Sequence, residues 1–251
     1  MGDSLEAAIV SFTTGLLFVS VIALFRKDVR SGFRQIFSAV NLKLLPSWRL
    51  GAGALGASFV AMQTYAVPIA GVALFTVASL AGQTGISLWV DHVGLAGGSR
   101  VIITKRRVIA AIITILAVVV STWDRFTISN FSLLTIVLAV FSGTWVGVQR
   151  ALNGQINSYS KASFATSLLN FITGTTFLLI LIVAGLILGR NELSPLPSGP
   201  WWIYTGGVIG VIYIAFTSTI VQHLGVLTFT LISVGGQLVG SLLIDLYSPT
   251  Q

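Results

Sequence analysis

The sequence predicts an all-α polytopic membrane protein, on the evidence of its composition, its long uncharged runs and the positions of its basic residues. Of its 251 residues, 55% are apolar and only 8% are charged, whereas a soluble domain carries about 25% charged residues. So few charges cannot cover a folded domain in water, but lipid tolerates apolar surface on every side of a helix. We therefore expect a bundle of membrane-spanning helices.

Eight segments are apolar for long enough to cross a bilayer, which takes about 20 residues in a helix. The run Leu50–Val90 contains no charge over 41 residues and predicts two spans. A break is expected near Pro68 and Gly71, because proline cannot join the helix ladder. The run Leu193–Ile244 predicts two further spans, with a break near Gly225. The other four expected spans are Ala7–Phe25, Val101–Trp123, Phe126–Gln149 and Ala162–Gly189.

The basic residues indicate the direction of crossing, because cytoplasmic loops collect lysine and arginine. The loops after the first, third, fifth and seventh spans share one side, and they hold 12 of the 14 basic residues. The basic loops 26–49 and 91–107 are therefore predicted to be cytoplasmic, and Arg150 and Lys161 are assigned to the loop after the fifth span. The net charge of +7 is then a topology signal, and nucleic-acid binding is not expected.

The two parts of the chain, residues 1–125 and 126–251, repeat each other. From the prolines onward the matched residues are a constant 154 positions apart, and such an ordered series predicts a shared structure. The loop after the first span is basic and its counterpart is neutral, so the copies are expected to have opposite topology, as in secondary transporters. The matched residues are Ser11, Phe12 and Gly15 with Asn170, Phe171 and Gly174; Pro46, Trp48, Gly53 and Gly56 with Pro200, Trp202, Gly207 and Gly210; and Gly71, Phe75, Gln83, Ser87 and Asp91 with Gly225, Phe229, Gln237, Ser241 and Asp245.

The repeat also predicts a unit larger than eight helices. A span follows Asp91 in the first copy, whereas only Leu246–Gln251 follows Asp245 in the second. The span at 126–149 has no counterpart before the first span. The chain thus fits helices two to nine of a ten-helix (5+5) inverted-repeat transporter fold that lacks its first and last helices, and a truncated form is expected.

Several short motifs recur in the same order along the chain. They are the Gly-x-Gln-x-x-x-Asn stretch at Gly147, Gln149 and Asn153, the Ser-Phe and Asn-Phe helix starts, the Pro-x-Trp entries at Pro46 and Pro200, and the two Gly-Gln…Asp helices. In these motifs the sequence resembles the bacterial drug/metabolite transporter superfamily, in its YdcZ-like branch related to EamA transporters. The resemblance covers nearly the whole chain. It implies a multi-pass protein of the bacterial cell inner membrane that transports a small solute, and it names no substrate.

Gln83 and Gln237 are the first candidates for binding a solute. Each lies well inside an uncharged span, at the same repeat position. Inverted repeats place such a pair on opposite sides of an axis near the middle of the membrane, where transporter sites lie. Amides donate and accept hydrogen bonds, which suits a neutral or zwitterionic polar solute. Hydrogen bonding between helices is the alternative interpretation.

Gln149, Asn153 and Asn170 are the further candidates for binding. Gln149 and Asn153 are four residues apart and share a helix face. They follow Gly143 and Gly147, which allow close approach of a neighbouring helix. For all three residues, lining a solute site and joining helices by hydrogen bonds both stay open.

Asp91 and Asp245 lie at matched span ends. A carboxylate near a helix C-terminus meets an unfavourable dipole, so proton or cation coupling is one interpretation and a solvated interfacial carboxylate is the other. No acidic residue lies deep in any span. This argues against exchange of a proton for a cationic drug at a buried carboxylate.

The sequence shows no sign of an enzyme, a metal site or a cofactor. It has no cysteine and two separated histidines, so no nucleophile–base pair or metal-ligand set is found. The expected partners are a small-molecule solute and membrane lipid, and a homodimer is left open. The alternative function is a non-transporting membrane partner or sensor protein.

Overall fold

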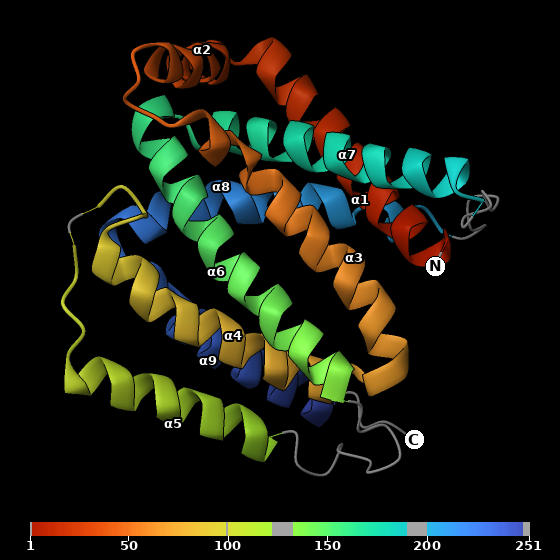
Figure 1. The fold of residues 1–251 in the computed structure, drawn as a ribbon, viewed down its shortest axis with the longest axis vertical. Coiled ribbons are helices and arrows are strands. Elements are labelled where there is room, and N and C mark those ends of the chain that lie inside the picture. The colour runs from red at the N-terminus through yellow and green to blue at the C-terminus, as the bar shows by residue number, and fades with distance from the viewer. Residues whose placement is uncertain (1, 99, 122–132, 190–199, 248–251) are drawn as a thin grey trace.

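The computed structural model describes residues 2–98, 100–121, 133–189 and 200–247, and all regular structure in these ranges is helical (Figure 1). The all-α architecture expected from composition is confirmed. The helices are α1 (Gly2–Phe25), α2 (Lys27–Asn41), η1 (Ser47–Gly51), α3 (Ala52–Ala70), α4 (Val72–Val93), α5 (Lys105–Ser121), α6 (Leu133–Ser160), α7 (Ser163–Ile187), η4 (Trp201–Tyr204), α8 (Gly206–Leu224) and α9 (Val226–Tyr247), where η marks a 3₁₀ helix.

Five helical segments in the described ranges are long and apolar enough to cross a membrane. They belong to α1, η1 with α3, α6, α7 and α8. The chain is therefore a multi-pass membrane protein. Helices α4, α5 and α9 lie where the remaining spans are expected, and the count of eight spans stays a prediction.

The basic loop expected at 26–49 contains a helix that the pattern of apolar runs does not predict. Helix α2 is amphipathic, with Val29 and Ile36 on its buried face and Arg30 and Arg34 exposed. Its polar face makes it too hydrophilic to span a bilayer, and such a basic amphipathic helix is typical of a membrane surface. The Arg30 guanidinium donates a hydrogen bond of 3.0 Å to the carbonyl oxygen of Ala23, near the end of α1.

Helix α6 crosses the centre of the molecule and packs against α4, α3 and α8 (Figure 1). Its contact with α4 is backbone to backbone. A Cβ added to Gly82 would lie 2.0 Å from the carbonyl oxygen of Val140, and one added to Gly143 would lie 1.9 Å from that of Ser79. Only glycine allows this approach, which is a recurrent way of packing helices in lipid. Helix α5 lies at the edge, against α4 and α9.

Single glycines join α3 to α4 and α8 to α9. Gly71 has φ 81° and ψ 156°, and Gly225 has φ 81° and ψ 160°. This combination is essentially confined to glycine. The breaks expected in the two long uncharged runs are confirmed at these residues, with Pro68 lying in the last turn of α3.

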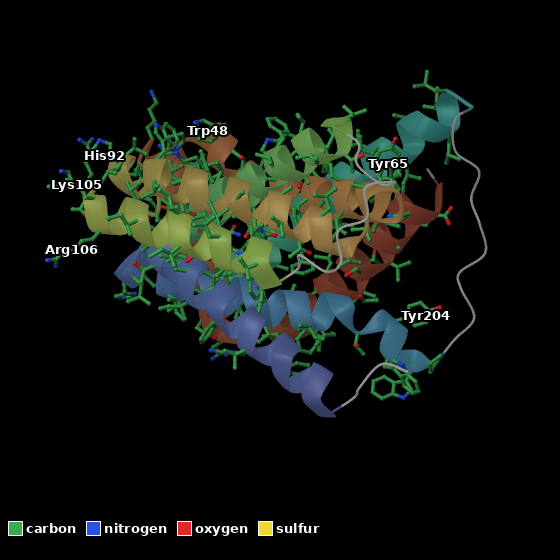
Figure 2. The ribbon with its side chains drawn as sticks, turned by 90° about the horizontal axis from the view of Figure 1, so that it is seen from below. Trp48, Tyr65, His92, Lys105, Arg106 and Tyr204 are labelled. Carbon is green, nitrogen blue, oxygen red and sulfur yellow. The ribbon has the colours of Figure 1, made fainter. Side chains whose placement is uncertain are left out.

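The labelled basic residues of α4 and α5 lie at one end of the bundle. Figure 2 shows His92, Lys105 and Arg106 at one end and Tyr65 and Tyr204 toward the other. The chain reverses at Gly71 between α3 and α4, so that α4 carries His92 back to the end where α3 began. The basic residues named here thus share an end, and their assignment to the cytoplasm is taken up below as a proposal.

The glycine joint at Gly71 leads to a first prediction. We expect Gly71→Ala to lower the free energy of unfolding by about 1–3 kcal/mol, because alanine at this φ and ψ is strained. A Cβ at Gly71 would meet no atom within 4 Å, so the loss would come from the backbone alone. The measurement is thermal or denaturant unfolding of the purified protein in detergent.

Gly51→Ala is the matched control. Its added Cβ also meets nothing within 4 Å, but Gly51 has φ −72°, which alanine adopts freely. Equal losses in the two variants would contradict the backbone explanation.

Candidate functional site: a polar cavity between the two halves

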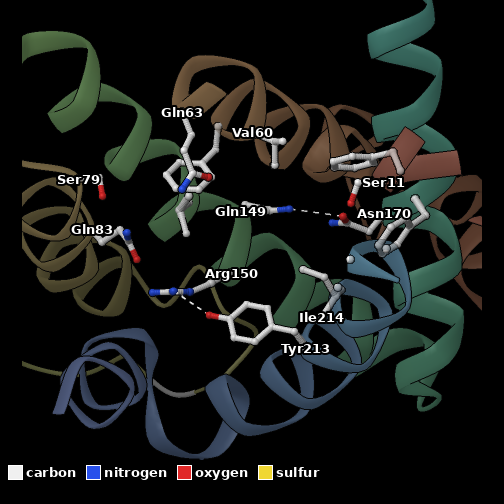
Figure 3. Close-up of a pocket in the computed structure, with 18 of the residues that line it drawn as sticks. Ser11, Val60, Gln63, Ser79, Gln83, Gln149, Arg150, Asn170, Tyr213 and Ile214 are labelled. Atoms are coloured by element: carbon white, nitrogen blue, oxygen red, sulfur yellow. Dashed lines mark hydrogen bonds between the residues drawn. The ribbon is translucent and has the colours of Figure 1, made fainter. Parts of the chain in front are cut away.

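A cavity of about 450 Å³ lies between helices of both halves of the chain (Figure 3). Its volume is typical of sites for small molecules. Helices α1, α3, α4, α6, α7, α8 and α9 contribute to its walls. The aromatic lining residues are Phe12, Phe59, Phe75, Phe171 and Tyr213. The other polar lining residues are Ser11, Gln63, Thr76, Ser79, Gln83, Gln149, Arg150, Asn170 and Gln237.

Four of the five candidates for solute binding meet at this cavity. Gln83 lines it from α4, Gln237 from α9, Gln149 from α6 and Asn170 from α7. Gln83 is buried, whereas Gln237 is exposed. In the described part of the chain no hydrogen bond joins the Gln83 amide to another residue, so this amide does not hold helices together here. Its role in binding stays a prediction.

Asn153 lies behind the cavity wall. The Gln149 Nε2 donates to Asn170 Oδ1 over 3.4 Å, and Asn170 Nδ2 donates to Asn153 Oδ1 over 2.9 Å. This chain of amides joins α6 to α7, so Asn153 serves as interhelical contact in this structure. Gln149 and Asn170 combine that contact with exposure to the cavity. Gly56 leaves room for Gln149, since a Cβ there would lie 2.1 Å from Gln149 Nε2.

The assignment of Arg150 to a cytoplasmic loop is wrong. Helix α6 runs on to Ser160, so Arg150 lies inside the helix, 7% exposed, and lines the cavity. The apolar pattern predicts the end of this span at Gln149, because an arginine normally marks the end of a membrane-spanning run. The polar face of Gln149, Asn153 and Asn157, at steps of four, is the signal that could have extended the helix.

Arg150 is held by neutral groups from α8 and α9. Its Nη2 donates to the Tyr213 hydroxyl over 2.8 Å, and its Nη1 donates to Thr230 Oγ1 over 3.0 Å. The guanidinium carbon lies 5.5 Å from the centre of the Phe229 ring, a distance at which cation and ring attract. Its Nε is buried and has no hydrogen-bond partner within the described ranges.

Asp91 lies outside the cavity lining and caps a helix. It is 3% exposed, so the solvated-carboxylate interpretation is wrong for this residue. Its carboxylate accepts hydrogen bonds from the backbone N–H groups of Val226, over 2.7 Å, and Leu227, over 3.1 Å, at the start of α9. Arg107 forms an ion pair with it. The positive end of α9 and this arginine offset the unfavourable end of α4. Coupling by Asp91 stays a prediction, and the Asp245 side chain lies outside the described residues.

A helical membrane protein with polar groups around a central cavity is typical of transporters of small solutes. A model of the family described as "Putative inner membrane exporter, YdcZ" matches residues 1–120 and 134–249. The chain belongs to this family of the drug/metabolite transporter superfamily and is thus a membrane transporter. The resemblance seen in the sequence motifs is confirmed. Neither the curated proteins nor the solved structures that were searched contain a match.

The capping of α9 leads to a second prediction. We expect Asp91→Ala to lower the free energy of unfolding by about 3–5 kcal/mol, because it leaves the partly buried Arg107 and two backbone N–H groups without their acceptor. The measurement is equilibrium unfolding in detergent.

Asp28→Ala is the control for this prediction. Asp28 pairs with Arg26 at the surface, with both side chains about half exposed (51%), and such pairs contribute little. No measurable change is expected there. A loss in Asp91→Ala no larger than in Asp28→Ala would show that the buried cap is not needed.

Proposed function

We propose that this protein is a secondary transporter of a small metabolite, working by alternating access between two inverted repeats. The substrate would bind in the central cavity, at Gln83, Gln237, Gln149 and Asn170. Asn153 would support Gln149 and Asn170 from behind the wall. The observation that carries the proposal is the lining of the cavity, to which residues 1–125 and 126–251 contribute matched positions.

The contacts between α1 and α7 support the repeat. A Cβ added to Gly174 would lie 2.3 Å from the ring of Phe12. A Cβ added to Gly15 would lie 2.1 Å from the ring of Phe171. The two rings lie 5.3 Å apart between their centres. If Phe12 is exchanged with Phe171 and Gly15 with Gly174, the same set of contacts results. This equivalence supports a two-fold axis between α1 and α7. Figure 1 shows α1 and α7 running in opposite directions.

A second set of contacts obeys the same exchange. A Cβ on Gly53 would lie 1.9 Å from the carbonyl oxygen of Asn170, and one on Gly207 would lie 2.0 Å from that of Ser11. The aromatic pair Phe59 and Phe75 corresponds to Tyr213 and Phe229, with ring centres 5.9 and 6.5 Å apart. The helix joints at Gly71 and Gly225 have the same backbone angles.

The lining of the cavity supports a site on this two-fold axis. Six matched pairs of residues line it, one member from each half, and they are Ser11 and Asn170, Phe12 and Phe171, Gly56 and Gly210, Phe59 and Tyr213, Val60 and Ile214, and Gln83 and Gln237. In inverted-repeat transporters a site on the axis stays fixed while one half rocks against the other. The basic loops 26–49 and 91–107 would face the cytoplasm, and the family's description favours movement of solute outward.

A ligand screen gives the third prediction. In a thermal-shift screen of the full chain against a metabolite library, we expect a transported solute to raise the melting temperature, because a ligand at 100 times its Kd stabilises by about 2.7 kcal/mol. The double variant Gln83→Ala, Gln237→Ala should lose most of this shift.

Gln222→Ala is the matched control, because its amide donates to the Ser218 carbonyl oxygen of its own helix over 2.7 Å. It should keep the full shift. A shift that survives in the double variant would move the site away from the two glutamines.

Transport itself is tested in liposomes that contain the purified protein. A solute found in the screen should cross faster than in empty vesicles, and the double variant should be slower. Binding without movement above the empty-vesicle background, together with a stoichiometric protein partner on purification, would favour the non-transporting partner or sensor.

A further inference from the structure

Arg150 is a buried cation for which the described structure provides no counter-ion. A guanidinium is charged at every physiological pH. The ion pairs within the described ranges are Arg26 with Asp28 and Arg107 with Asp91, and neither involves Arg150. Asp245 is fifteen residues beyond the Arg150 contact Thr230 on α9, which is about 22 Å along the helix. Among the described residues, the positive charge of Arg150 is therefore balanced only by neutral dipoles and the Phe229 ring.

A structural role alone does not account for this charge. Arg150 joins α6 to α8 and α9 through Tyr213 and Thr230, but a neutral donor would make the same contacts without the cost of burying a charge. The orphaned Nε adds to that cost. An anion beside the guanidinium would remove it, and the cavity is the space from which an anion could reach Arg150.

The geometry around Arg150 is that of a donor site. The Tyr213 hydroxyl accepts a hydrogen bond from Arg150, so its own hydrogen remains to be donated. Both residues line the cavity, and Figure 3 shows this pair on one side and the Gln149–Asn170 pair on the other. No acidic residue is among the described lining residues. Charged and neutral N–H and O–H groups facing one space favour an oxyanion.

We propose that the cavity binds a small organic anion, with its oxyanion group on Arg150 and Tyr213; this rests on the proposal that the cavity is the solute site. One arginine matches a single negative charge. The aromatic rings of Phe59 and Phe75 suit an apolar body. The Gln83 amide has no hydrogen-bond partner among the described residues, and it lines the cavity, where it would contact a further polar group. A cavity of about 450 Å³ has room for an organic acid of the size of benzoate.

The charge of the solute also sets the driving force. A membrane potential of 100 mV, negative inside, favours exit of a monoanion by roughly fiftyfold. An anion exporter of this kind needs no proton-carrying carboxylate in its site, which agrees with the lining. The membrane potential would then drive outward movement.

Binding is tested with two series of probes, and within each series the shape is nearly constant while the charge is negative, zero or positive. The full chain in phosphatidylcholine nanodiscs is titrated with benzoate, benzamide and benzamidine, and with hexanoate, hexanamide and hexylamine, by calorimetry and thermal shift. Each acid should bind more tightly than its amide, and the cations should not bind. In Arg150→Gln the acids should bind roughly ten- to a hundredfold more weakly, the range expected for hydrogen bonds to a charged group, while the amides change little.

Three further variants sharpen the result. Arg150→Lys should keep the preference for acid over amide, Tyr213→Phe should weaken the acids only, and Arg34→Gln, an exposed arginine on α2, should change nothing. Tight binding of either cation, an unchanged affinity for acids in Arg150→Gln, or no binding of any acid at millimolar concentration would overturn the anion proposal. Competition between phosphatidylglycerol and benzoate for Arg150 would overturn it in favour of a lipid phosphate.

A transport measurement separates this inference from the proposed function. Benzenesulfonate stays charged and does not leak across lipid, so its efflux from liposomes can be followed under a potassium diffusion potential set with valinomycin. Faster efflux at inside-negative potential, lost in Arg150→Gln, is expected. Movement of a neutral or cationic solute that depends on Gln83 and Gln237 but not on Arg150 would support the transporter proposal and overturn the anion proposal. Anion binding without movement of any solute would support the anion proposal and overturn the transporter proposal.

Discussion

The close contact of α6 with α4 determines where the chemistry of this protein lies. Gly82 and Gly143 bring the two backbones together, with no side chain between them. In lipid there is little hydrophobic force to associate helices, so packing of this kind and interhelical hydrogen bonds have to supply the attraction. With α6 held at the centre, its polar face of Gln149, Arg150 and Asn153 points toward α7, α8 and α9. The cavity and the amide chain behind its wall both depend on this position.

The cavity combines a matched set of residues with one unmatched helix. Positions that match in the sequence line it from α1, α3 and α4 and from α7, α8 and α9. In the proposed repeat, helix α6 has no counterpart in the described part of residues 1–125, and it brings the only arginine among the described lining residues. The half that contains Arg150 also has tyrosine at 213, where the other half has Phe59, so the hydroxyl that Arg150 contacts is present on one side only.

Much of the architecture and part of the site follow from local patterns. The long uncharged runs predict apolar helices because only helices and closed β-barrels satisfy the backbone in lipid, and barrel strands are shorter and alternate in polarity. The breaks at Gly71 and Gly225 follow from glycine and proline chemistry. Gln83 and Gln237 stand out because an amide in an apolar run needs a reason to be there. Helix α2 does not follow from these patterns, because an amphipathic helix at a surface carries no long apolar run. The hydropathy pattern predicts a loop at Arg150, because the charge outweighs the helical spacing of its polar neighbours.

The sequence by itself determined that this protein lies in a membrane, that its chain crosses repeatedly, and that matched amides occur in its two halves. These properties depend on solvent preference and on the order of residues, both of which are local. The tertiary structure alone decided that Gln83, Gln149, Asn170 and Gln237 share a cavity, that Asp91 caps α9, and that Arg150 lies buried with no described carboxylate paired to it. Those facts depend on which helices approach one another and on how closely, and residues far apart in the chain set that distance together.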